Sequence, residues 1–201
     1  MTQEGFTVWF VGLTGSGKST LAERLRDDLA RRGRAAELLD AGKIRQQLNR
    51  DLGFTRDDVE KNLKRIGYEC KLLNRNGVVA IVAAISPYRD VRDAVRADVG
   101  RWVEIYCRCS MDTLLNRDTK GLLQQAQDGK LDNVAGINAP FDEPIKPEVL
   151  LNTDTESPDD CSAKILTTLE MLGYLEQVKP ATYSKREEEL IRQRLQDLGY
   201  L

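Results

Sequence analysis

A glycine-rich turn between an apolar run and an amphipathic stretch constrains this chain more than any other feature. The turn, Gly12-Leu-Thr-Gly-Ser-Gly-Lys-Ser19, matches the pattern G-x-x-x-x-G-K-[ST]. The apolar residues 6–11 before it predict a buried strand, and the spacing of residues 19–32 after it predicts a helix. In that context backbone N–H groups and the positive end of the helix dipole surround phosphate groups. The sequence therefore predicts a nucleoside triphosphate site.

The pattern also assigns roles within the turn. We expect Lys18 to bridge the β- and γ-phosphates of the nucleotide and the Ser19 hydroxyl to ligate Mg²⁺. The residues expected to contact the nucleotide are Gly12, Leu13, Thr14, Gly15, Ser16, Gly17, Lys18, Ser19 and Thr20.

Further apolar runs alternate with amphipathic stretches along the chain. Strands are predicted at 35–39, 78–85, 102–107 and 149–151, and helices at 57–76, 88–99, 111–117 and 159–172. Gly77 is expected to terminate the helix that precedes it. Because strands alternate with helices, right-handed β-α-β crossovers follow. The predicted fold is α/β, a P-loop NTPase-type three-layer sandwich with a parallel sheet and a lid segment.

Composition excludes several functional classes. The chain has no histidine, which excludes Ser-His and Cys-His catalytic pairs and His-ligated metals. A formal net charge of −2 does not support a nucleic-acid partner. No apolar run reaches the roughly 20 residues of a membrane span, so no membrane partner is expected. The cysteines form no C-x-x-C pair and the N-terminus does not resemble a signal peptide, so a cytoplasmic location is expected.

Three classes of nucleotide-binding protein compete at this point. A GTPase should carry an N-K-x-D motif, which residues 118–121 do not match. A motor ATPase would be longer and would usually show an apolar strand that ends in Asp-Glu. Here the second predicted strand is followed by Asp40, which places one carboxylate near the γ-phosphate, where it could deprotonate an acceptor hydroxyl or orient a Mg²⁺-bound water. A small-molecule kinase is therefore favoured.

The chain divides into two predicted parts. Residues 1–177 form the kinase domain, and the weakly patterned residues 118–158 form its lid, because long loops of this kind are usually functional. Residues 178–201 form an appended helix, with capping-box spacing between Ser184 and Glu187. The helix carries an apolar stripe expected to pack on its own domain or on a second subunit, made of Leu190, Ile191, Leu195 and Leu198.

Several segments together resemble the adenylylsulfate kinase family. These segments are Gly12-Leu-Thr-Gly-Ser-Gly-Lys-Ser-Thr20, Leu39-Asp40, Ile44-Arg45, Leu48-Asn-Arg-Asp-Leu-Gly-Phe54, Ile85-Ser-Pro-Tyr-Arg89, Arg117-Asp-Thr-Lys-Gly-Leu122 and Ala135-Gly-Ile137. The resemblance covers about residues 5 to 175. It implies transfer of the γ-phosphate of MgATP to the 3′-hydroxyl of adenosine 5′-phosphosulfate (APS), which gives PAPS in sulfate assimilation. A homodimer is also implied.

The resemblance further implies roles on both sides of the reaction. Asp40 is the carboxylate at the transfer site and a metal ligand, Arg117 approaches the ATP adenine, and Lys120 lies in the lid over the phosphates. Ser86 is the position that the family assigns to a phosphoserine intermediate. An alternative from the residues themselves, which we favour, is that Ser86 is a helix N-cap with Pro87 as the first helical residue.

The remaining implied contacts are with the acceptor. Arg45 is expected to bind its phosphate or sulfate, Phe54 to stack on its adenine, and Asn62 and Ile85 to lie beside it. From residue type alone, three of these side chains could also be structural: Arg45 as a surface arginine, Phe54 as a core aromatic and Asn62 as an ordinary helix-face asparagine.

The chain departs from the family pattern mainly on the acceptor side. Gly42 stands where the family has a second acid, Val59 where it has an arginine, and Val134 where it has a second aromatic; Leu123 replaces a tyrosine after the lid lysine. Loss of such contacts would weaken an APS site. Three readings therefore remain: a divergent APS kinase, a related kinase with a different hydroxyl acceptor, or a module that binds a nucleotide without transfer.

Overall fold

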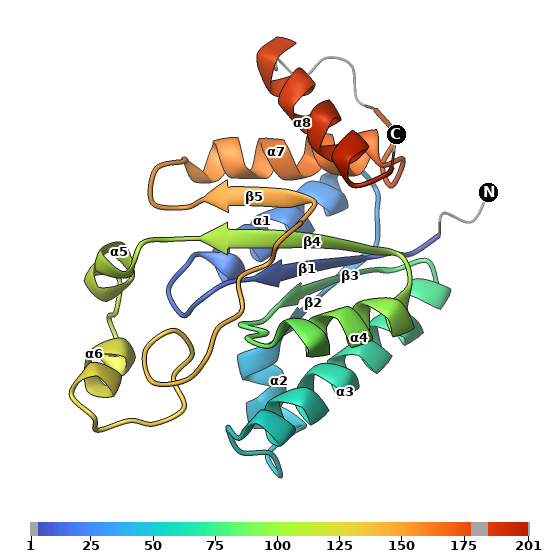
Figure 1. Ribbon diagram of the computed structural model, residues 1–201. Helices are drawn as coiled ribbons and strands as arrows, with labels where there is room; N and C mark the ends of the chain where they lie inside the picture. The colour runs from blue at the N-terminus through green and yellow to red at the C-terminus, as the bar shows by residue number, and fades with distance from the viewer. Residues whose placement is uncertain (1–3, 178–184, 201) are drawn as a thin grey trace.

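A five-stranded parallel sheet forms the centre of the computed structural model, which describes residues 4–177 and 185–200 (Figure 1). The strand order is β2-β3-β1-β4-β5, and every neighbouring pair is parallel. The strands are β1 (Thr7–Val11), β2 (Ala36–Asp40), β3 (Val79–Ala83), β4 (Trp102–Arg108) and β5 (Val149–Asn152). Each of them lies at a stretch that the apolar pattern had predicted.

Helices cover both faces of the sheet, which confirms the predicted α/β sandwich (Figure 1). The helices are α1 (Lys18–Arg31), α2 (Ala41–Gln47), α3 (Arg56–Arg75), α4 (Arg89–Val99), α5 (Met111–Asn116), α6 (Leu122–Gln127), α7 (Pro158–Met171) and α8 (Lys185–Asp197). Helices α1 and α7 pack on one face, and α3 and α4 on the other.

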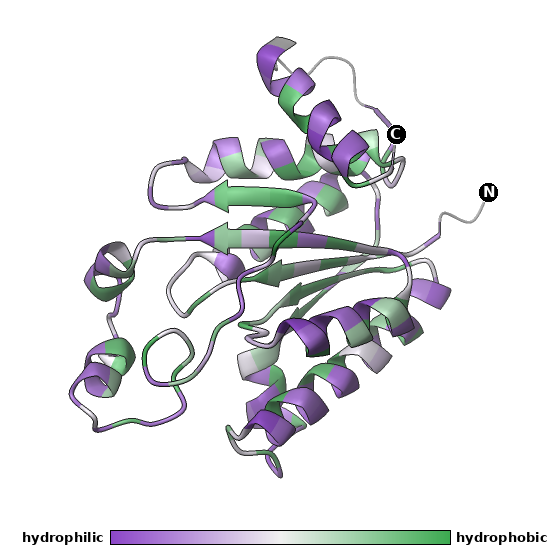
Figure 2. Ribbon diagram, in the orientation of Figure 1, coloured by the Kyte–Doolittle hydropathy of each residue, from purple (hydrophilic) through white to green (hydrophobic). Residues whose placement is uncertain are grey.

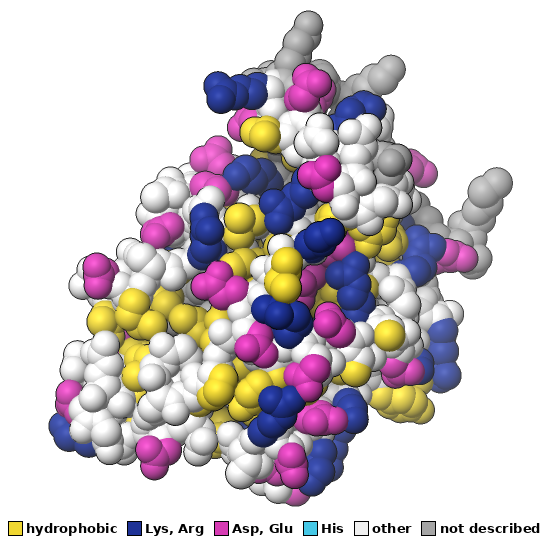
Figure 3. All heavy atoms as spheres, viewed as in Figure 1, with side chains coloured by type: hydrophobic (Ala, Val, Ile, Leu, Met, Phe, Trp, Pro, Cys, Tyr) yellow, Lys and Arg dark blue, Asp and Glu magenta, His cyan; other side chains and the backbone are white. Residues whose placement is uncertain are grey.

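The two faces bury separate hydrophobic clusters, because side chains alternate along each strand. In β1, Val8 and Phe10 belong to the cluster beneath α1 and α7, whereas Trp9 and Val11 belong to the cluster beneath α3 and α4. Figure 2 shows mostly hydrophobic colours in the strands, whereas hydrophobic and hydrophilic colours alternate along the helices. On the face seen in Figure 3, Lys and Arg side chains lie among Asp and Glu side chains, in keeping with the nearly balanced net charge.

The structure corrects some predicted bounds and adds two helices. The apolar run 78–85 predicted a longer strand than β3, which ends at Ala83, level with the end of β2 at Asp40. Helices α2 and α6 are short and were not predicted. Gly77 follows α3 with a φ of 76°, as expected of a residue that ends a helix.

The C-terminal helix packs on the rest of the chain. Leu195 is completely buried, Arg194 Nε donates to the carbonyl of Pro147 (2.9 Å), and the hydroxyl of Tyr200 donates to Glu148 Oε1 (2.9 Å). The predicted stripe is only partly buried, since Leu190 is 65% exposed. The capping role of Ser184 lies outside the described residues. Among the helices that the structure describes, none is long and apolar enough to cross a membrane.

Deletion of residues 178–201 should lower the thermal stability of the protein. It removes the buried Leu195 and takes the Tyr200 hydroxyl away from the buried carboxylate of Glu148. We expect a loss of about 2–4 °C in Tm, from a loss of about 1 kcal/mol. Calorimetry measures the shift, with Leu190→Ala as the control because that side chain is exposed. An unchanged Tm and oligomeric state after the deletion would contradict the packing.

Candidate active site

The glycine-rich turn connects the end of β1 to the start of α1 and has the backbone that a phosphate cradle needs. Gly12, Gly15 and Gly17 have φ values of 153°, 83° and 85°. A Cβ on Gly12 would lie 2.5 Å from the carbonyl oxygen of Cys107, so only glycine fits there. Backbone N–H groups in a turn of this kind form an anion-binding concavity.

Lys18 is buried within this turn. Its Nζ donates to the carbonyl of Leu13 (2.7 Å) and to Ser16 Oγ (3.4 Å). Desolvation lowers the pKa of Lys18 from 10.5 to about 8, although Asp40 opposes that shift. Because burial penalises the charged ammonium, an anion placed in the turn would restore its protonated form.

Asp40, at the end of β2, contacts the glycine-rich turn. Ser19 Oγ donates to Asp40 Oδ2 (3.1 Å), while Asp40 Oδ1 accepts from the backbone nitrogens of Gly42 (2.9 Å) and Lys43 (3.0 Å). The carboxylate therefore caps α2 with one oxygen and faces the turn with the other. Its position follows from the register of the sheet, because β1 and β2 flank β3 and both end at this edge.

A pocket of about 520 Å³ opens beside the turn. Arg117 borders it and donates from Nη2 to the carbonyl of Thr153 (2.8 Å). The loop after β5, residues 153–157, also lines the pocket, together with the start of α7. Thr20 and Cys161 complete it, so the pocket is continuous with the phosphate-binding turn. Sequence reasoning assigned Arg117 but missed this loop, because no motif marks it.

The residues expected on the acceptor side lie in and around α2 and the loop before α3. Phe54 is 63% exposed, and the guanidinium of Arg45 lies 4.6 Å from the centroid of its ring. Arg45 also donates to the carbonyl of Gly53. Burial lowers the pKa of Arg45. The structure thus brings Arg45 and Phe54 together, and the exposure of Phe54 excludes a core role for it.

Asn62 is buried rather than exposed on a helix face. Its Oδ1 accepts from Asn49 Nδ2 (2.8 Å), and Arg65 in turn donates to Asn49 Oδ1 (3.0 Å). Arg65 also binds Asp51 through two hydrogen bonds, of 2.9 and 2.8 Å. These contacts tie the loop that carries Phe54 to α3. Asn62 therefore helps to hold the loop that carries Phe54 in place.

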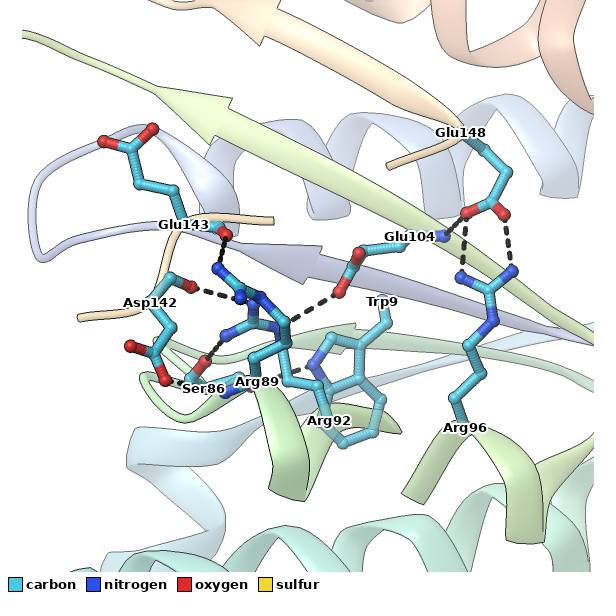
Figure 4. Close-up of polar contacts among 9 residues, drawn as sticks. All are labelled: Trp9, Ser86, Arg89, Arg92, Arg96, Glu104, Asp142, Glu143 and Glu148. Carbon is cyan, nitrogen blue, oxygen red and sulfur yellow. Dashed lines mark hydrogen bonds and ion pairs between the residues drawn. The ribbon is translucent and has the colours of Figure 1, made fainter. Parts of the chain in front are cut away.

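Ser86 follows β3 and is 1% exposed (Figure 4). Its Oγ accepts from the indole nitrogen of Trp9 (2.9 Å), and its φ is 48°. Helix α4 starts at Arg89 with Tyr88 as its N-cap, so the predicted N-cap role of Ser86 is wrong. The long-range bond from Trp9 holds Ser86 in a turn that local sequence does not reveal. Ile85, beside it, is half-buried.

The segment that leads from α5 to β5 passes over the turn. A Cβ on Gly136 would lie 2.7 Å from the side chain of Leu13, so this segment touches the phosphate-binding turn. Asp118 accepts from the backbone nitrogens of residues 122–124 and thereby holds the turn that carries Lys120. Lys120 is exposed, and the described structure gives its ammonium no hydrogen bond or ion pair.

Three of the positions that depart from the family pattern lie in different segments: Gly42 on α2, Val59 on α3 and Val134 between α6 and β5. Gly42 is exposed, and a Cβ there would lie 3.2 Å from Asp40 Oδ1. Val59 is partly buried against the cluster beneath α3 and α4. The backbone nitrogen of Val134 donates to Asn138 Oδ1 (2.8 Å), so this turn is held without an aromatic side chain.

The cradle, the buried lysine and the carboxylate beside them define a P-loop phosphotransferase. Residues 4–152 match the family model described as adenylylsulphate kinase. The adenylyl-sulfate kinase of Rippkaea orientalis is 42% identical over 175 residues, which are 87% of this chain and 97% of that protein. A probable bifunctional SAT/APS kinase 2 of Sorangium cellulosum is 45% identical over 85% of this chain, which spans 29% of that longer protein.

A solved structure agrees with these relatives. The Mycobacterium tuberculosis APS kinase CysC, in complex with AMPPNP and APS, superposes with a TM-score of 0.79 and 36% identity over 83% of this chain and 98% of its own. A hexameric APS kinase from Thiobacillus denitrificans superposes with a TM-score of 0.66 and 34% identity, over 88% of this chain and 31% of its own. The chain belongs to the adenylylsulfate kinase family.

Nucleotide binding should take up protons above about pH 8. In the free protein Lys18 loses its proton near that pH, and nucleotide phosphates favour the charged form. Below pH 8 the lysine is already protonated, so uptake should vanish there, and the affinity for MgATP should fall as pH rises above 8. Titration calorimetry at pH 7 and pH 9, in buffers of different ionisation enthalpy, measures the uptake. The same uptake in Lys18→Met would assign it to another group.

The contact between Gly136 and Leu13 predicts a specific loss of nucleotide binding in Gly136→Ala. The new methyl would displace the side chain of Leu13, whose backbone carbonyl accepts from Lys18 Nζ. Gly129→Ala is a matched control, because Gly129 also has a positive φ, of 69°, but nothing lies within 4 Å of its Cβ position. We expect the KM for ATP to rise about tenfold or more only in Gly136→Ala. Equal effects of the two substitutions would mean that backbone strain alone is responsible.

Proposed function

We propose that this protein transfers the γ-phosphate of ATP to the 3′-hydroxyl of APS, as an adenylylsulfate kinase. The observation that carries the proposal is the arrangement of Lys18, Ser19 and Asp40 around one glycine cradle, with Arg45 and Phe54 on the elements that follow Asp40. The family match supports APS as the acceptor.

The site offers contacts for both the phosphates and the adenine of ATP. The glycine cradle and Lys18 would hold its phosphates, and the pocket between Arg117 and residues 153–157 would hold its adenine. Thr14, Gly15 and Thr20 would contact the nucleotide along the way. The carbonyl of Thr153 keeps the guanidinium of Arg117 at the rim of that pocket, where its planar face can stack on a base.

The oxygen donors of Ser19 and Asp40 suit Mg²⁺. Their oxygens are 3.1 Å apart, and Mg²⁺ in kinases is usually held by one or two protein oxygens together with substrate phosphates. Bound Mg²⁺ neutralises charge on the transferring phosphoryl group. Asp40 Oδ2 is also the carboxylate oxygen that faces the turn, so we assign it the orientation of the acceptor hydroxyl and acceptance of its proton.

We assign to this arrangement a direct transfer of the γ-phosphate from ATP to the acceptor, with no phosphoserine intermediate. Phosphoryl transfer needs positioning and charge stabilisation, and the ammonium of Lys18 supplies charge at the cradle. Ser86 accepts the indole N–H of Trp9 and is buried, so we assign it a place in the wall of the acceptor site rather than a covalent step. Lys120, exposed and without a partner in the described structure, would close over the phosphates with the 118–158 segment as a lid.

The acceptor would lie between Arg45, Phe54 and the loop after β3, where Ile85 and Asn62 border it. The guanidinium of Arg45 now lies over the ring of Phe54. Binding of APS would therefore require the guanidinium to turn to the acceptor's phosphate or sulfate and to free the ring for its adenine.

The remaining expectations are a homodimer and a cytoplasmic location. The four cysteines are free thiols, which suits a reducing compartment. Light scattering after size-exclusion chromatography tests the assembly.

Release of ADP from MgATP, with APS compared against AMP, adenosine and a panel of sugars, tests the function. We expect APS to be preferred by at least about a hundredfold in kcat/KM, because a site that binds charged groups discriminates strongly against acceptors that lack them. No turnover with APS, or equal turnover with another acceptor, would overturn the assignment.

Asp40→Asn should separate the chemistry of Asp40 from its structural role. The amide oxygen of asparagine can still cap α2, but it can no longer accept a proton from the acceptor. We expect kcat to fall about 10²-fold or more, with little change in the KM for ATP. Asp98→Asn, which removes an exposed carboxylate paired with Lys71 at a distance from the site, is the control. A kcat within about twofold of the wild type would restrict Asp40 to capping.

A further inference from the structure

Arg92 is a buried arginine for which the sequence suggested no role. It lies on α4, is 2% exposed, and uses its guanidinium in three directions (Figure 4). Nη1 donates to the carbonyl of Ser86 (2.6 Å), Nη2 donates to the carbonyl of Asp142 (2.8 Å), and Nε pairs with Glu104 Oε1 (3.2 Å). A planar guanidinium holds such partners in a fixed relative geometry.

One carbonyl belongs to the loop after β3, which borders the proposed acceptor site, and the other to the end of the segment in which Val134 stands where the family has its second aromatic. Ser86 lies in the loop after β3, at the sheet edge where Asp40 ends β2. Asp142 ends the segment that crosses the phosphate-binding turn at Gly136. Two more hydrogen bonds join the same two segments. The backbone nitrogen of Asp142 donates to the carbonyl of Pro87 (2.7 Å), and the backbone nitrogen of Arg89 donates to Asp142 Oδ2 (3.1 Å).

Glu104 makes the burial of this cation tolerable. It lies on β4, is 9% exposed, and forms the ion pair with Arg92 from the strand side. An isolated buried guanidinium would be strongly unfavourable, whereas a paired one with its donors satisfied is not. Glu104 on the sheet thus holds the guanidinium of Arg92 in place, and the guanidinium in turn holds the two loop carbonyls.

We propose that Arg92 is a positioning residue that ties the loop after β3 to the returning end of the 118–142 segment, and so sets the width of the acceptor site. This inference rests on the proposed function, because it concerns the binding of APS. Arg92 makes no hydrogen bond to the nucleotide cradle among the described contacts, and the cradle is built from its own glycines and Lys18.

Arg92→Met removes the tie, and Arg96→Met is its matched control. Arg96 lies one helical turn further along α4 and is likewise paired with a buried carboxylate, Glu148 (2.5 Å), but it touches neither Ser86 nor Asp142. We expect Arg92→Met to lower kcat/KM for APS about 10- to 100-fold, since small displacements of a substrate have effects of that size. The KM for ATP should change by less than about twofold. In Arg92→Lys, which keeps the charge and some of the donors, kcat/KM for APS should lie between the values of Arg92→Met and Arg96→Met.

A double variant separates positioning from stability. Arg92→Met leaves Glu104 as an unpaired buried carboxylate and should lower Tm. Arg92→Met/Glu104→Gln removes that charge, so Tm should recover while APS turnover stays low. Glu104→Gln alone keeps both bonds from Arg92 to the loops and should lose much less turnover. Recovery of turnover together with Tm in the double variant would overturn the proposal.

Hydrogen exchange tests the tie without any substrate. The amides of Asp142 and Arg89 should exchange at least about tenfold faster in Arg92→Met than in Arg96→Met, because their partners lose their common support. Equal exchange in the two variants, or an equal loss of APS turnover, would overturn the role of Arg92. If the wild-type protein fails to use APS, the proposed function fails, and the exchange comparison still decides whether Arg92 holds the two segments together.

Discussion

Parallel pairing of β3 with both β1 and β2 decides where the candidate groups lie. Ala83 is in register with Phe10 on one side and with Asp40 on the other. The three strands therefore end at one level, and the phosphate-binding turn, the carboxylate of Asp40 and the loop of Ser86 emerge side by side. Parallel sheets commonly place ligands at this edge, beyond the carboxyl ends of the strands. A shift of one residue in any strand would separate the groups.

The two halves of the site are built differently. The nucleotide half consists of a glycine turn, in which Gly12 lies against the backbone of Cys107, and of a lysine that is buried within it. The proposed acceptor half combines the exposed Phe54 of a loop with Arg45 of α2, and buried polar residues, Asn62 and Asn49, hold that loop from behind. Surface loops with few buried contacts open at low free energy, so the loop that carries Phe54 is the part that can adjust around a substrate.

Local patterns in the sequence were sufficient to predict the strands, the phosphate-binding turn and the carboxylate after the second strand. Each of these depends on residues close together in the chain. The N-cap role of Ser86 was predicted wrongly, because the conformation of this residue depends on Trp9, 77 residues away, and on the contact of its carbonyl with Arg92. The burial of Asn62 and the pocket wall at residues 153–157 were missed for the same reason, since both arise only when distant segments meet.

The buried ammonium of Lys18 connects stability to binding. Lowering its pKa from 10.5 to about 8 corresponds to about 3 kcal/mol at pH values below 8, at 1.36 kcal/mol per pH unit. This free energy disfavours folding, because the unfolded chain holds the Lys18 proton more tightly than the folded chain does. The contribution of Lys18 to the free energy of unfolding therefore falls as pH falls from 10.5 to about 8 and is constant at lower pH. Phosphate groups in the cradle remove that penalty by pairing with the ammonium. Part of the affinity for the nucleotide therefore comes from removal of the desolvation cost of the Lys18 ammonium. Bound nucleotide should accordingly stabilise the fold most at pH values below about 8, where Lys18 is charged.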